Sequence, residues 1–165
     1  MSEHYFVTAD NGHLRVYLER NEPGQRMPGL QQVEAMDFPA GRQSYNARDT
    51  AMAGRFQGSK HQAAATGAPG AAVARTGMSI DERLPMQREE NRRRVRDVAA
   101  EIEAFFASRG GATWDFAGAP EFRSAVVEQL SPKVRTQLRR TISKDLVNQP
   151  AEDVRAHFVE AAGRH

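Results

Sequence analysis

Two aspartates are the carboxylates with the greatest potential for chemistry. Asp10 follows the first apolar run of the chain, and Asp115 lies inside a short aromatic-rich run. With Glu101 or Glu103 from the segment before Asp115, they would form the carboxylate set of a nuclease, which converges on two metal ions. However, Asp10 precedes Asn-Gly and is explained by turn chemistry, and short acidic matches are often false positives. A metal-dependent nuclease is therefore the weakest of our hypotheses.

Other catalytic and cofactor-binding patterns are missing from the sequence. The chain has no cysteine, which excludes disulfides, thiolate catalysis and Cys-ligated zinc. None of the five histidines stands four residues from another, as a helical zinc site requires. There is neither a Gly-x-Ser-x-Gly nucleophile motif nor a glycine pattern for binding phosphates. We therefore expect no catalytic residue, no metal and no cofactor.

Basic residues gather in two segments, although the net charge is only +2. Such clusters can bind phosphate-rich partners. The more common alternative is a solvated helical face interspersed with acidic residues. The candidate contacts to phosphate or to another partner are Arg55, Arg92, Arg93, Arg139, Arg140 and Lys144.

The N-terminal part predicts an antiparallel meander of three strands. Residues 4–9 are aromatic and β-branched, and residues 13–19 alternate between apolar and polar side chains. Asn11-Gly12 between them predicts a hairpin, because both residues tolerate positive φ. Residues 31–38 supply the third strand. Tyr5, Phe6 and Tyr17 would suit a base-stacking platform, but packing explains most aromatic side chains in strands, and we favour packing.

Residues 39–78 change character. Gly, Ala, Arg, Gln and Ser dominate there, and large apolar side chains are sparse. We expect a long flexible loop, least ordered at 63–73, that is either mobile or ordered by a partner. An alternative is a short helix at 47–56 that docks Met52 and Phe56.

The second half alternates helices with strands. Helical periodicity starts near residue 82 and ends at Gly110-Gly111, because glycine is preferred after a helix. A strand is predicted at 113–117 and another at 141–143. Between them, one helix starts at Pro120 and a second at Ser131-Pro132, with Val134 and Leu138 of the second pointing inward. A last helix has Pro150 in its first turn, and its Val154 and Phe158 point inward.

This order predicts a single α/β domain over residues 1–165. The expected architecture is a mixed sheet, an antiparallel meander plus parallel strands, covered by helices. No apolar run approaches the roughly 20 residues that span a bilayer. The N-terminus has no basic segment followed by an apolar one, so we expect no secretion signal and a cytoplasmic protein.

Several segments resemble the bacterial host attachment protein family. The opening run Val7–Leu18 is similar to the family's first strand, turn and second strand, and Ala53–Phe56 with Ser59 resembles its Gly-Arg plus Ser segment. Asp81-Glu82 and the basic helix after them resemble its central helix. The run Leu130–Phe158, with its Lys-Asp-Leu turn, resembles the C-terminal signature. One departure is the segment 113–120, where family members have an apolar strand that ends in Pro-Pro.

The resemblance implies a fold similar to the middle domain of archaeal and eukaryotic class-I release factors, which is related to ribonuclease-H-like sheets. The peptide-release activity of that domain depends on a Gly-Gly-Gln loop. This chain has Gly110-Gly111-Ala112 and no Gly-Gly-Gln anywhere. The family also implies a part in attachment to host cells, but it supplies no catalytic residues.

The leading hypothesis is therefore a non-enzymatic, cytoplasmic binding or regulatory protein of the host attachment type, with an unknown protein partner. The alternative is an RNA- or ribosome-associated module, as the release-factor-like fold and the arginine clusters suggest. Salt dependence separates the two, because binding to phosphates weakens steeply as salt rises.

Overall fold

The computed structural model describes residues 3–24, 27–38 and 80–163, and the side chains of the last range from residue 84 onward. The predicted loop at 39–78, the alternative helix at 47–56 and the candidate contact Arg55 lie outside the described residues.

The described residues contain one five-stranded mixed sheet in the order β3-β2-β1-β4-β5. Strands β1 (His4–Ala9), β2 (His13–Arg20) and β3 (Gly29–Asp37) form the expected antiparallel meander. Strands β4 (Thr113–Ala117) and β5 (Leu138–Ile142) continue the sheet in parallel to β1. The predicted fold class, a mixed α/β sheet covered by helices, is confirmed.

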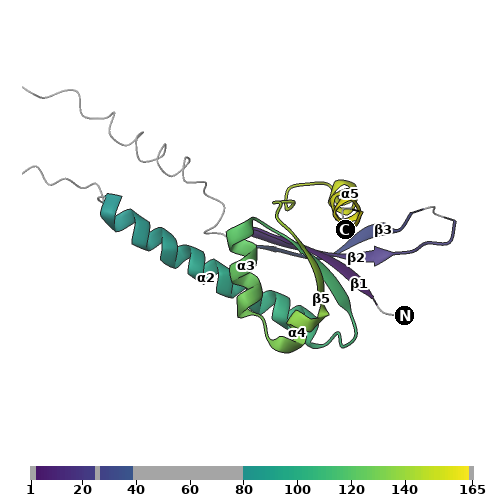
Figure 1. The fold of residues 1–165 in the computed structure, drawn as a ribbon, viewed down its shortest axis with the longest axis horizontal. Coiled ribbons are helices and arrows are strands. Elements are labelled where there is room, and N and C mark those ends of the chain that lie inside the picture. Colours follow the sequence, from purple (N-terminus) through teal and green to yellow (C-terminus); the bar gives the residue numbers. More distant parts are fainter. Residues whose placement is uncertain (1–2, 25–26, 39–79, 164–165) are drawn as a thin grey trace, which may run out of the picture.

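Helices cover both faces of this sheet (Figure 1). Helices α2 (Ile80–Ala107), α3 (Pro120–Gln129) and α4 (Pro132–Gln137) lie on one face, and α5 (Ala151–Ala162) lies on the other. Among the described residues, no helix is long and apolar enough to span a membrane.

Each face has its own apolar core, because successive side chains of a strand point to opposite faces. The larger core packs Val98, Ile102 and Phe106 of α2 against Trp114 and Phe116 of β4. The smaller core packs the α5 side chains Val154 and Phe158 against the other face, as expected for a docked closing helix. The strand and loop residues of this smaller core are Phe6, Tyr17, Ala117 and Leu146.

The aromatic side chains of β1 and β2 belong to these cores. Tyr5, Phe6 and Tyr17 are all less than 5% exposed. Burial at this level leaves no stacking surface for a base. Packing, rather than a base-stacking platform, is therefore the role of these three side chains.

The turn between β1 and β2 is held by the Asp10 carboxylate. Its Oδ1 accepts hydrogen bonds from the backbone N–H groups of Gly12 and His13 at 2.6 Å. The glycines with positive φ in the described residues are Gly24 and Gly111, so the turn forms without a positive φ at Gly12. The predicted hairpin is confirmed.

Two boundaries of secondary structure elements differ from the prediction. Strand β5 begins at Leu138, which pairs with Trp114, so Leu138 does not extend the preceding helix as predicted. Pairing with β4 satisfies the backbone where the six-residue helix α4 stops. Pro150 is the residue that precedes helix α5, one position earlier than expected.

Candidate functional site

Asp115 is a fully buried charged residue in the middle of β4. Its neighbours Trp114 and Phe116 point into the α2 core, so Asp115 points to the face that carries α5. The side chain is 0% exposed. Because β4 is flanked by β1 and β5, Asp115 lies in the interior of the sheet.

Arg140 of β5 is the main partner of this carboxylate. Its Nε and Nη2 donate to Asp115 Oδ2 at 3.1 and 2.6 Å. The register between β4 and β5 shifts here, so that Trp114 pairs with Leu138 and Asp115 with Arg140. Arg139 is the extra residue of this bulge. The bulge therefore decides which of the two adjacent arginines meets the buried carboxylate.

His4 of β1 completes the cluster from the other side. Its Nε2 lies 3.4 Å from Asp115 Oδ2, and its Nδ1 lies 2.9 Å from Thr113 Oγ1. The ring packs edge-on against Phe6, with centroids 4.9 Å apart. The hydroxyl, imidazole and carboxylate thus form a chain of contacts between β1 and β4.

The charge state of Asp115 follows from these contacts. Burial raises the pKa of Asp115, but the hydrogen bonds and positive charge supplied by His4 and Arg140 lower it more, so the net pKa lies below its ordinary value. The carboxylate is therefore ionised near neutral pH and neutralised by Arg140. A carboxylate in this state is a poor proton acceptor, so the cluster is suited to fixing β1, β4 and β5 together.

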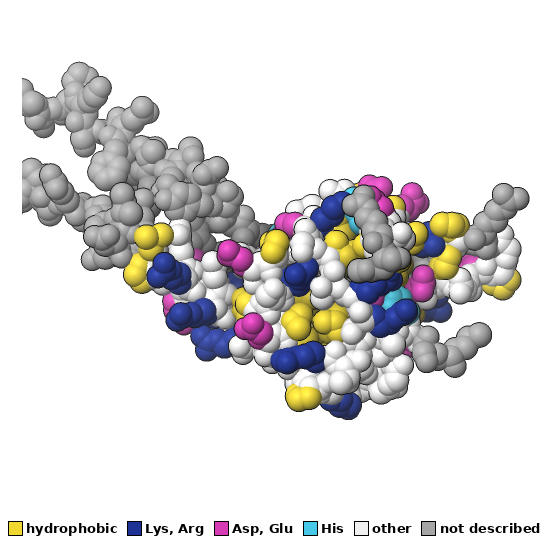
Figure 2. Space-filling model, in the orientation of Figure 1, with side chains coloured by type: hydrophobic (Ala, Val, Ile, Leu, Met, Phe, Trp, Pro, Cys, Tyr) yellow, Lys and Arg dark blue, Asp and Glu magenta, His cyan; other side chains and the backbone are white. Residues whose placement is uncertain are grey.

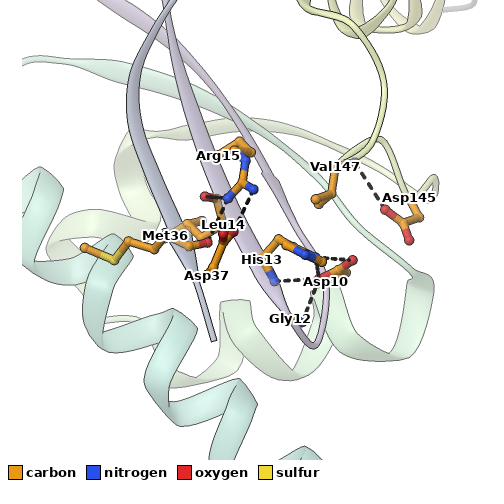
Figure 3. Close-up of polar contacts among 9 residues, drawn as sticks. All are labelled: Asp10, Gly12, His13, Leu14, Arg15, Met36, Asp37, Asp145 and Val147. Carbon is orange, nitrogen blue, oxygen red and sulfur yellow. Dashed lines mark hydrogen bonds and ion pairs between the residues drawn. The ribbon is translucent and has the colours of Figure 1, made fainter. Parts of the chain in front are cut away.

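Asp10 has a different role from Asp115, because it holds the turn between β1 and β2 (Figure 3). Besides the turn amides, its carboxylate contacts His13 Nδ1 at 3.0 and 3.1 Å. Asp115 pairs with Phe6, four residues before Asp10, which is about 13 Å along the strand. The two aspartates therefore do not face one metal site.

The glutamates of the nuclease hypothesis lie on α2, on the opposite face of the sheet from Asp115. Glu103 there binds the start of α4, because its carboxylate accepts from Ser131 N at 3.1 Å and from Ser131 Oγ at 2.5 Å. Ser131 itself caps α4, as predicted. In the part of the chain that the structure describes, no three His, Asp or Glu side chains are grouped so as to hold a metal ion.

The predicted phosphate contacts that lie within the described residues do not all share one surface. Arg92 and Arg93 are exposed on α2, and Arg139 and Lys144 are exposed on and just after β5. Arg140 points to the α5 face and is engaged with Asp115. Arg92 and Arg93 thus belong to a different surface from the residues around β5.

Along β5, the predicted contacts Arg139 and Lys144 are joined by three cations that the candidate contacts did not include. We call the surface that they form the β5-edge basic surface, and its residues are Arg123, Lys133, Arg135, Arg139 and Lys144. Arg123 Nη1 donates to Ser143 Oγ at 2.7 Å, and Lys144 Nζ contacts His157 Nδ1 at 3.2 Å. Lys133 and Arg135 donate to backbone carbonyls. Figure 2 shows Lys and Arg side chains over this part of the molecule.

The cations of this surface are not matched by ion pairs in the part of the chain that the structure describes. Among the described residues, none of its five cations forms an ion pair with a carboxylate, whereas the adjacent Arg140 does. Arg123 was missed because it lies far from the other four in the sequence, and only the fold brings α3 beside the end of β5. The His4–Asp115 contact was missed for the same reason, since it joins residues 111 positions apart.

A comparison with protein-family models matches residues 5–158 to the family described as "Protein required for attachment to host cells". The match includes all five strands of the sheet except the first residue of β1, and most of α5. A search of curated proteins found no match.

Proposed function

The chain belongs to the family of proteins required for attachment to host cells, and from this premise we propose that it is a non-enzymatic binding protein that contacts an acidic partner protein. The β5-edge basic surface is the proposed contact. The observation that carries the proposal is the set of five cations that have no carboxylate partner among the described residues. Uncompensated cations on one surface create a positive potential that attracts anionic partners.

The form of β5 supports contact through side chains rather than addition of a further strand. This edge strand has five residues, a bulge at Arg139 and two adjacent arginines. Short length, bulges and charge are the features that keep sheet edges from pairing with other chains. A partner would therefore meet the guanidinium and ammonium groups, for which carboxylates are good acceptors.

The buried Asp115–Arg140 pair supports a non-enzymatic role. Arg140 neutralises the carboxylate. The Thr113 hydroxyl contacts His4, and the Thr113 backbone N–H donates to Glu3 O at 3.0 Å. The one hydroxyl–imidazole–carboxylate chain at this site thus has a compensated acid. We propose a cytoplasmic location and an indirect, regulatory part in attachment.

RNA, free or in the ribosome, is the second candidate partner. The same uncompensated cations favour it, because phosphates bind arginine as carboxylates do. An RNA partner would lose affinity steeply with salt, through release of counterions. The affinity for a protein partner held by fewer ion pairs would depend less steeply on salt concentration.

A pull-down from bacterial lysate with the full chain as bait tests the proposal. We expect capture of an acidic protein that survives nuclease treatment and is lost with the triple variant Arg123→Glu, Arg139→Glu, Lys144→Glu. Arg20→Glu on β2 is the control, because Arg20 is also exposed but lies away from β5. Capture lost on nuclease treatment would favour RNA. Equal capture by the triple variant and by Arg20→Glu would refute the β5-edge basic surface as the contact for the partner.

A further inference from the structure

We draw no further inference here: the strongest candidate, the groove between α2 and α3 that Val95, Phe122 and Ala125 line, carries nothing, because nothing in the part of the chain that the structure describes shows what covers it.

Discussion

Arg140 and Asp115 meet across a bulge in the parallel pair β4–β5, with Nη2 of the arginine 2.6 Å from Oδ2 of the aspartate. The aspartate is fully buried, and the arginine side chain is 29% exposed. The pair therefore joins the edge strand β5 to the interior of the sheet. The bulge residue Arg139 stays exposed and belongs to the β5-edge basic surface.

The first prediction concerns this pair. Arg140→Ala leaves the buried Asp115 charge without its main partner, and removal of one member of a buried pair typically costs about 3–5 kcal/mol. Chemical denaturation should show a loss of this size in the free energy of unfolding. Arg139→Ala removes the exposed neighbour and should change stability by less than about 0.5 kcal/mol. Equal effects of the two variants would contradict the register shift.

The second prediction is the pH dependence of the same pair. The pKa of Asp115 lies below its ordinary value of 3.8 in the folded protein. The ionised carboxylate therefore stabilises the fold above the pH at which an unfolded aspartate titrates, and this contribution is lost as pH falls through the folded pKa.

Asp115→Asn removes the titrating carboxyl group and keeps a side chain of similar size. The difference in unfolding free energy between the parent and Asp115→Asn should be large near neutral pH and should shrink as pH falls below the ordinary aspartate pKa of 3.8. Asp145→Asn is the control, because Asp145 is exposed and its carboxylate accepts the Val147 N–H, at 3.2 Å (Figure 3). A difference for Asp115→Asn that is constant with pH would mean that the carboxylate is not ionised in the fold.

The third prediction concerns the closing helix. Phe158 of α5 is 1% exposed, and its ring lies 4.7 Å from that of Phe6. Phe158→Ala should cost about 3–5 kcal/mol, because it opens a cavity in the smaller core. Val159→Ala on the exposed side of the same helix should do little, since Val159 is 48% exposed. Thermal melting of both variants measures the difference, and unchanged melting of Phe158→Ala would mean that α5 is not docked.

The closing helix also shows what the sequence could predict. Val154 and Phe158 are four residues apart, and this local spacing identifies the buried side of α5 without knowledge of the fold. The strands β1, β2 and β4 were predicted for the same reason, since their apolar runs are local patterns. Contacts that follow from the spacing and type of residues close together in the chain can therefore be predicted from a single sequence.

The candidate site was less predictable, because its contacts are not local. Asp115 and Arg140 are 25 positions apart, and the choice of Arg140 over Arg139 depends on a bulge that has no sequence signal of its own. Arg140 was a candidate contact to phosphate or to another partner, and the sequence did not show that it also binds Asp115. Asp10 was correctly linked to turn chemistry, since that bond pattern spans three residues.

The last prediction separates two glycines that the sequence presents as equivalent. Gly110 and Gly111 follow α2, but only Gly111 has a positive φ, of 87°. Neither would meet another atom if a Cβ were added, so backbone conformation alone distinguishes them. Gly111→Ala should lower the free energy of unfolding by roughly 1–2 kcal/mol, because L-residues are strained at positive φ. Gly110→Ala should be neutral or slightly stabilising, since alanine restricts the unfolded chain. Denaturant titration of the two variants measures this contrast, and a larger loss for Gly110→Ala would show that the turn into β4 is built differently.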